Sequence, residues 1–283
     1  MATMLRKRFL VSFLRLTRVW NLLILALSQY FTAAMLISTA NVFDVRFFLL
    51  VTSTCMIAAA GYIINDYYDV KIDLVNKPER VVIGQGITRR YAILLHTVLS
   101  ISGVAIGVFL DWRIGLINFV SAFLLWWYSN DLKRQPFIGN LVVAILTALS
   151  IMIVDTLYKT GNYLIFIYAS FAFFITLIRE IIKDMEDLKG DNTFGCRTLP
   201  IIWGLRKTKL LIYSIIFLFS LTVLAFNLFF VRLPLYYFIP FLFIPLLWLL
   251  FSLIRADTKK DFAWLSSFCK VILLLGVLSM AFV

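Results

Sequence analysis

Charged residues are scarce in this chain. They make up 15% of its 283 residues, whereas hydrophobic residues make up 62% and the mean hydropathy is +0.95. A water-soluble domain of this length carries a larger share of polar residues, because its surface must face water. The composition therefore excludes an ordinary soluble globule and predicts a protein whose main solvent is lipid.

Cysteine and histidine are also rare. The three cysteines, Cys55, Cys196 and Cys269, show no paired spacing, so neither a disulfide framework nor a zinc site is indicated. The single histidine, His96, falls within an apolar run, where a packing role is more common than a catalytic one. The N-terminal residues lack the uninterrupted apolar stretch and the cleavage site of a removable signal peptide.

Long apolar runs, by contrast, are abundant. A membrane-crossing helix needs about 20 mostly apolar residues, since its backbone must satisfy its own hydrogen bonds. Eight charge-free windows and a ninth that contains only Lys270 meet this requirement. We predict an all-α polytopic bundle of nine transmembrane helices, forming one domain over residues 1–283. The windows are 19–43, 47–65, 91–110, 114–130, 135–154, 160–178, 210–231, 233–254 and 262–283.

Positive charge is distributed unequally between the connecting segments. With nine spans, 22 of the 27 lysines and arginines fall on one side of the membrane and four on the other. The positive-inside rule then places the N-terminus and the long segments 66–90 and 179–209 in the cytoplasm, under an inner or plasma membrane. This orientation explains the net charge of +12 without a nucleic-acid partner. Both long segments are predicted to be loops, and we expect function there.

Acidic residues are few, yet eight of the 15 gather in two stretches. In the first, Asn65, Asp69 and Asp73 are four residues apart, so a continued helix would place them on one face. In the second, Glu180, Asp184, Asp187 and Asp191 share a face by the same geometry. Stacked carboxylates repel one another unless a cation joins them, and hard oxygen ligands suit Mg²⁺ that bridges to phosphate.

Lysine and arginine accompany both acidic stretches, which fits a magnesium diphosphate better than a bare cation. If the two faces turned toward each other, they would form a diphosphate clamp. One such cluster alone can equally be a solvated surface just outside a membrane. The accompanying cations are Lys71, Lys77 and Arg80 in the first stretch, and Arg179, Lys183, Lys189 and Arg197 in the second.

Segments 65–73 and 184–191 resemble the two aspartate-rich motifs of the UbiA superfamily of intramembrane prenyltransferases. Arg18 and Asn21 are similar to the Arg and Asn of that family's first helix, and 128–133 to its Tyr/Lys stretch. The resemblance implies a helical membrane fold, a prenyl diphosphate donor and one or two Mg²⁺ ions. It is closest to the branch that transfers a geranylgeranyl group to a glycerol-phosphate lipid.

The acceptor stays open at this point. After residues 76–80 the chain continues as Val-Val-Ile-Gly-Gln-Gly, in place of the Pro-Ser-Gly-like turn usual in that branch. One acceptor is the hydroxyl of geranylgeranylglyceryl phosphate, which would give an ether lipid. The alternative is an aromatic quinone precursor, either 4-hydroxybenzoate or dihydroxynaphthoate.

The resemblance and the chemistry of the residues imply three sets of site residues. Expected metal ligands are Asn65, Asp66, Asp69, Asp73, Asp184, Asp187 and Asp191, of which Asp69, Asp73, Asp187 and Asp191 are expected to be catalytic. Expected substrate-binding residues are Arg18, Asn21, Lys71, Lys77, Arg80, Tyr128, Lys133 and Lys183. Aromatic rings that could shield an allylic cation are Tyr62, Tyr67, Tyr68, Trp127 and Tyr128, although Trp126 and Trp127 also suit an interfacial belt.

Two other functional classes fit less well. A transporter would carry ionisable residues near the bilayer midplane, and the interiors of the nine windows contain almost none. A noncatalytic scaffold would have no use for two metal-binding faces. The sequence therefore favours a membrane prenyltransferase, with membrane lipids around it and a prenyl diphosphate and an acceptor as its substrates.

Overall fold

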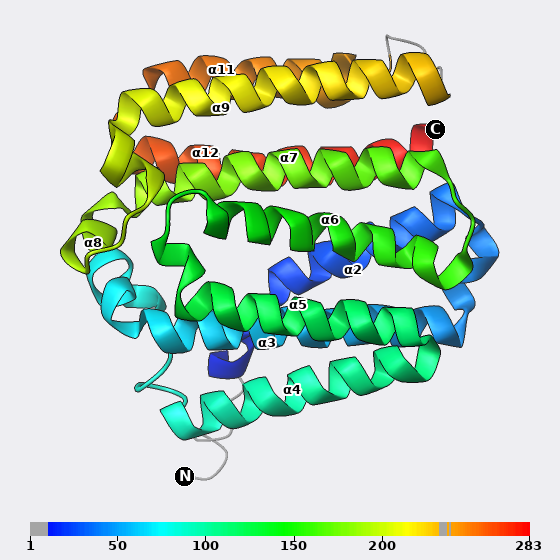
Figure 1. The fold of residues 1–283 in the computed structure, drawn as a ribbon, viewed down its shortest axis with the longest axis horizontal. Helices are drawn as coiled ribbons and strands as arrows, with labels where there is room; N and C mark the ends of the chain where they lie inside the picture. The colour runs from blue at the N-terminus through cyan, green and yellow to red at the C-terminus, as the bar shows by residue number, and fades with distance from the viewer. Residues whose placement is uncertain (1–10, 232–236, 238) are drawn as a thin grey trace. The chain divides into compact units, whose positions relative to one another are not determined.

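The structure is a computed structural model that describes residues 11–231, 237 and 239–283. These residues form helices and short connections, with one isolated β-bridge between Ile83 and Ile87 and no strand (Figure 1). The all-α class is confirmed. The main helices are α2 (Val19–Leu36), α3 (Val45–Asn76), α4 (Arg89–Leu110), α5 (Trp112–Asn130), α6 (Ile138–Tyr158), α7 (Tyr163–Glu186), α8 (Leu188–Thr193), α9 (Leu199–Phe226), α11 (Ile244–Arg255) and α12 (Lys259–Ser279).

Seven helices in the described part of the chain are long and apolar enough to cross a membrane. They begin at Val19, Val45, Arg89, Ile138, Tyr163, Leu199 and Lys259. The two other predicted windows also coincide with helices, namely α5 and the shorter apolar helix Ile239–Arg255. The latter begins with the π-helical turn η5 (Ile239–Phe243). The polytopic class is thus confirmed, while the count of nine spans is approximate.

Both connections that we predicted to be long loops are mostly helical, so that part of the prediction is wrong. Helix α3 runs for 32 residues and carries the first acidic stretch to Asn76. It ends where the Lys77 amide bonds to the Asp73 carbonyl, and Pro78 follows, which cannot continue the hydrogen-bond ladder. Beyond α7, helix α8 and the start of α9 occupy much of 179–209. The first acidic stretch is consequently held on a rigid element.

The described chain divides into two compact units. The first comprises residues 11–27 and 43–133, and in it α3, α4 and α5 pack against one another (Figure 1). A small residue permits this close approach, because a Cβ at Gly61 would lie 2.8 Å from the side chain of Leu125. The His96 Nδ1 atom on α4 lies 3.0 Å from the Ala60 carbonyl on α3. This contact supports the packing role expected for the histidine.

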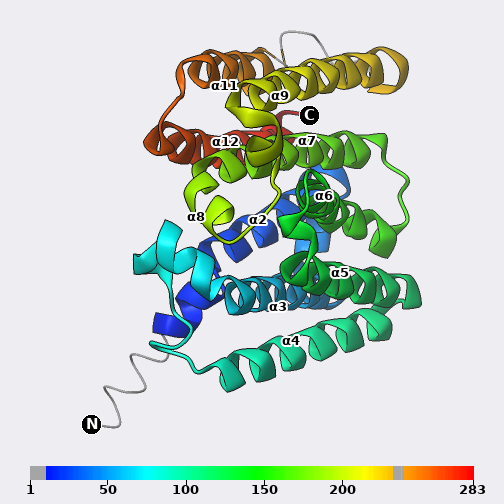
Figure 2. The same ribbon diagram turned by 60° about the vertical axis from the view of Figure 1, so that its left-hand side comes forward.

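The second unit comprises residues 28–42 and 134–283, apart from the undescribed positions. Helix α7 packs against α6, α9 and α12, and Figures 1 and 2 both show α9 and α11 side by side. The core contains Ile175, Ile178, Phe219 and Leu249, which are fully buried. Burial of this apolar face fixes α7, which carries Glu180 and Asp184 of the second acidic stretch. That the whole chain forms one domain stays a prediction.

Candidate active site

The first acidic cluster consists of Asn65, Asp66, Asp69 and Asp73 on α3. Because α3 is helical throughout this stretch, Asn65, Asp69 and Asp73 follow one another on the same face, as predicted from their spacing. All four side chains are half-buried. The face presents oxygen atoms at successive turns near the polar end of an apolar helix.

Arg18 holds one member of this cluster. Its guanidinium donates to Asp66 Oδ1 at 2.6 Å and lies 5.0 Å from the centre of the Tyr62 ring. The backbone of Arg18 has a φ of 50°, in the left-handed region that most residues avoid, just before α2 begins. Burial opposes the charge on Arg18, but Asp66, Tyr62 and Asp73 together outweigh this effect and raise the pKa of Arg18 above its ordinary value. Arg18 is therefore a fixed positive charge.

Lys133 holds a second member. Its ammonium group donates to Asp69 Oδ1, and the side chains of Lys133 and Asp69 are only 10% and 14% exposed. Lys133 lies in the short 3₁₀ turn η3 (Leu132–Arg134) that follows α5. The structure thus joins two predicted site residues that are 64 positions apart in the sequence.

The other predicted substrate-binding residues of this unit differ in their exposure. Lys71 is exposed on α3, Lys77 is half-buried at its C-terminal cap, and Asn21 is half-buried in the first turn of α2. Tyr128 is half-buried in the last turn of α5. The side chain of Arg80 lies outside the described residues. Their contacts with a substrate stay predictions.

Two of the aromatic rings expected to shield an allylic cation already face arginines. Arg18 lies over Tyr62, and the Arg89 guanidinium lies 5.3 Å from the centre of the Tyr67 ring. A ring face covered by a guanidinium is not open to a second cation. Trp127 is 41% exposed and packs on Phe123, which suits the interfacial role left open for it.

In the second unit, Glu180 is the centre of an ion-paired group on α7. Its side chain is 6% exposed and accepts from Arg179 at 2.5 Å and from Lys183 at 2.9 Å. One buried carboxylate therefore holds two cations, and the group keeps a net positive charge. Lys183, predicted to bind phosphate, is oriented by this contact, with its side chain 27% exposed.

Asp184 is held by a residue that the sequence analysis missed. The Asn140 amide on α6 donates to Asp184 Oδ2 at 2.9 Å, and Asn140 is buried. A signal was present, because an asparagine in an apolar helix needs a hydrogen-bond partner. The sequence alone does not say which partner that is.

Asp187 and Asp191 lie beyond the end of α7. Asp187 caps α7, with its amide bonded to the Lys183 carbonyl, and Asp191 lies in the short helix α8. The φ and ψ of Asp187, −93° and 7°, depart from helical values. The single continuous helix face predicted for Glu180, Asp184, Asp187 and Asp191 is thus divided between α7 and α8, which corrects that expectation.

Comparison with models of protein families identifies the family of this chain. The model of the UbiA prenyltransferase family matches residues 26–275, which is most of the sequence. The chain belongs to the UbiA prenyltransferase family. It is therefore a prenyltransferase and an integral membrane protein, as the two acidic motifs suggested.

Relatives of this UbiA member cover nearly its whole length. Digeranylgeranylglyceryl phosphate synthase of Sulfurisphaera tokodaii is 34% identical over 88% of this chain and 89% of its own. A structure described as giving insights into digeranylgeranylglyceryl phosphate synthase in membranes has a TM-score of 0.74 at 23% identity, covering 97% of this chain and 99% of that one. A UbiA homolog from Archaeoglobus fulgidus, solved bound to DMAPP and Mg²⁺, has a TM-score of 0.66 at 15% identity, with 96% and 100% covered. These two likenesses confirm the fold.

The chemistry of the donor sets in this UbiA protein fits Mg²⁺. Within the described ranges no three acidic, histidine or cysteine side chains meet as a ready-made metal cage. Mg²⁺ does not require one, since it is usually held by one or two carboxylates together with water and substrate phosphates. Asp69 and Asp73 on α3, and Asp184 on α7, offer hard oxygen atoms beside lysines that can contact phosphate.

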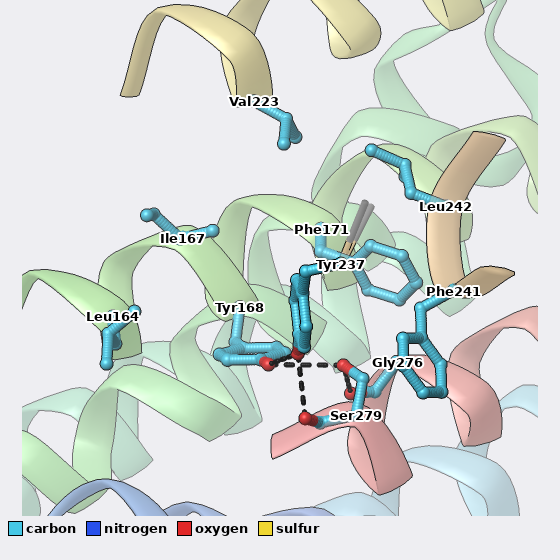
Figure 3. Close-up of a pocket in the computed structure, with 10 residues that line it drawn as sticks. All are labelled: Leu164, Ile167, Tyr168, Phe171, Val223, Tyr237, Phe241, Leu242, Gly276 and Ser279. Carbon is cyan, nitrogen blue, oxygen red and sulfur yellow. Dashed lines mark hydrogen bonds between the residues drawn. The ribbon is translucent and has the colours of Figure 1, made fainter. Parts of the chain in front are cut away.

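A pocket in the second unit lies away from Asp184, which belongs to the same unit. Figure 3 shows it between α7, α9, η5 and α12, with mostly apolar walls. The Tyr168 hydroxyl lies 2.7 Å from that of Tyr237 and 3.1 Å from that of Ser279 (Figure 3). Along α7, Tyr168 precedes Asp184 by 16 residues, or roughly 24 Å of helix. The hydroxyl groups satisfy one another, so the pocket is an apolar void rather than a diphosphate site.

Proposed function

We propose that this UbiA prenyltransferase transfers a geranylgeranyl group from its diphosphate to the hydroxyl of geranylgeranylglyceryl phosphate, forming an ether lipid. The observation that carries the proposal is the 34% identity with a digeranylgeranylglyceryl phosphate synthase over nearly the full length of both chains. An aromatic acceptor has no comparable support.

We assign Mg²⁺ binding to Asn65, Asp69 and Asp73 in one unit and to Asp184, Asp187 and Asp191 in the other, with Asp66 as a further ligand. Bound Mg²⁺ would neutralise negative charge that develops on the diphosphate as the C1–O bond breaks. Lys133 and Lys183 would contribute phosphate contacts, since Lys133 pairs with the proposed ligand Asp69 and Lys183 directly precedes the proposed ligand Asp184. That both acidic stretches serve one diphosphate stays a prediction.

We assign binding of the acceptor to Arg18, together with Asn21 and Tyr128. Arg18 is a fixed positive charge, which suits the phosphate of a glycerol-phosphate lipid. The acceptor oxygen attacks C1 of the prenyl group, the diphosphate leaves with the electron pair, and a site carboxylate takes the hydroxyl proton. Lys71, Lys77 and Arg80 complete the set of proposed phosphate contacts.

An acceptor panel tests the proposed function. The protein, purified in detergent with Mg²⁺, is given radiolabelled geranylgeranyl diphosphate and one of three acceptors. We expect a labelled ether lipid with geranylgeranylglyceryl phosphate, and little product with 4-hydroxybenzoate or 1,4-dihydroxy-2-naphthoate. Preferential labelling of either aromatic acid would contradict the proposed acceptor while leaving the family assignment intact.

We also propose that the acidic ends of α3 and α7 face the cytoplasm, on the basis of the lysine and arginine distribution. A single added cysteine tests this orientation in sealed membranes. Glu79 is exposed in the turn after α3, and Tyr163 is exposed at the start of α7. The two variants are Glu79→Cys and Tyr163→Cys. An impermeant maleimide added outside is expected to label only the cysteine at position 163. The reverse pattern would invert the orientation.

Asn140 provides a prediction about the second cluster. Asn140→Leu removes the hydrogen bond that orients Asp184, so we expect the Mg²⁺ concentration for half-maximal activity to rise about tenfold, equivalent to about 1.4 kcal/mol. A steady-state Mg²⁺ titration measures this change. Asn118→Leu is the matched control, because Asn118 is a buried amide that bonds to Ser53 and to the Gly103 carbonyl. The control is expected to lose stability but to keep its Mg²⁺ requirement, and an equal shift in both variants would contradict a specific role for Asn140.

A further inference from the structure

The ion pair between Lys133 and Asp69 lies on the face of α3 that is proposed to bind a divalent ion. It joins the turn after α5 to the middle of the acidic face of α3, and both side chains are largely buried. A lysine ammonium is a compact charge that water solvates strongly. In this setting Asp69 is the partner that compensates the charge on Lys133.

The same carboxylate is a proposed ligand for a divalent ion, and the two uses conflict. Whichever oxygen of Asp69 accepts the ion, the ammonium group of Lys133 remains a neighbour of like charge. Repulsion between the two is strong in a partly buried site, where water screens charges poorly. If Lys133 instead releases Asp69, a largely buried cation loses its partner, which is also unfavourable.

A diphosphate resolves this conflict, because its oxygens can replace Asp69 as the partner of Lys133. We propose that Lys133 is a positioning residue that couples the binding of the divalent ion to the binding of diphosphate. It exchanges Asp69 for a phosphate oxygen, so that each ligand binds more tightly when the other is present. This inference rests on the proposed function, in which Asp69 is a metal ligand.

Arg18 and Asp66 make a contrasting pair on the same helix. Asp66 lies outside the spacing of four that relates Asn65, Asp69 and Asp73, and Arg18 is additionally held over Tyr62. Arg18 can therefore keep one oxygen of Asp66, which is only a further ligand, when an ion binds to Asn65, Asp69 and Asp73. Of the two cations, Lys133 is the one whose partner lies on that ligand face.

Coupling is measured by binding alone, without turnover. Mn²⁺ is titrated into the purified protein and followed by electron paramagnetic resonance, first without anion and then at fixed inorganic diphosphate concentrations, with correction for the complex that forms in solution. In the native protein we expect diphosphate to tighten Mn²⁺ binding about tenfold or more, and Mn²⁺ to tighten diphosphate binding by the same factor. Lys133→Met is expected to bind Mn²⁺ alone about tenfold more tightly and to lose most of this coupling.

Two further variants test whether the effect depends on the charge and on the position of Lys133. They are Lys133→Arg and Lys209→Met. The arginine variant keeps the positive charge and is expected to retain coupling. Lys209 is a matched control, since its side chain is 12% exposed and it pairs with Asp257 at another place on the chain. Lys209→Met is expected to bind Mn²⁺ as the native protein does. Should Lys133→Met fold poorly, Lys133→Gln tests the same loss of charge with a milder change.

The outcomes separate this proposal from the proposed function. Unchanged Mn²⁺ affinity in Lys133→Met or Lys133→Gln, together with lost affinity in Asp69→Asn, would overturn the coupling role while Asp69 remained a ligand. Unchanged affinity in Asp69→Asn would overturn both. Tighter Mn²⁺ binding without Lys133, with coupling retained by Lys133→Arg, would support the exchange of partners.

Discussion

Asp69→Asn and Asp187→Asn are each expected to lower the rate of prenyl transfer by a factor of about 10²–10³ or more. Each change replaces a charged oxygen ligand with a neutral amide of the same shape, so it removes negative charge that holds Mg²⁺ beside the diphosphate. Loss of one group that stabilises charge in a transition state commonly has an effect of this size. Initial rates with labelled geranylgeranyl diphosphate over a range of Mg²⁺ concentrations measure it.

Asp257→Asn is the control for these two variants. Asp257 makes an ion pair with Lys209 at 3.1 Å, but its side chain is 82% exposed, so the same chemical change is expected to leave transfer within about twofold of the native rate. Circular dichroism of each variant checks that the helices persist. Near-native transfer by folded Asp69→Asn or Asp187→Asn would refute the ligand assignment for that position.

Most of the fold was predictable from the sequence because the bilayer imposes a simple requirement. Each apolar window had to become a helix, and the window at 47–65 indeed lies within α3, while the window at 160–178 lies within α7 except for its first three residues. The ends of these helices were not predictable in the same way. Helix α3 continues to Asn76 through charged residues, because a helix outside lipid depends on local hydrogen bonds and on proline rather than on hydropathy.

The candidate site was predictable in composition but not in its contacts. The spacing of Asn65, Asp69 and Asp73 indicated a common face, and the continuous helix provides it. By contrast, the contacts of Asp69 with Lys133 and of Asp184 with Asn140 join residues on different elements. Spacing along one helix carries no information on such pairs. They depend on how α3, α5, α6 and α7 pack within their own units.

Glu180→Leu is expected to lower the stability of the protein by about 3 kcal/mol, within the range for breaking a buried ion pair from one side. Glu180 is the buried carboxylate that holds both Arg179 and Lys183, and the buried Nε atom of Arg179 has no hydrogen-bond partner among the described residues. The change leaves two cations on one turn of α7 without their anion. Thermal unfolding in detergent is expected to show a midpoint roughly 5–10 °C lower.

Two companion variants show whether charge imbalance is the cause. Asp257→Leu removes the anion of the exposed ion pair with Lys209 and is expected to change the midpoint by less than about 2 °C. The triple variant Arg179→Met, Glu180→Leu, Lys183→Met removes all three charges, so it is expected to regain most of the lost stability. If Lys183 contacts the diphosphate as proposed, this stable triple variant will still transfer prenyl groups poorly. A triple variant that stays as unstable as Glu180→Leu would instead mean that Glu180 acts through packing rather than through charge.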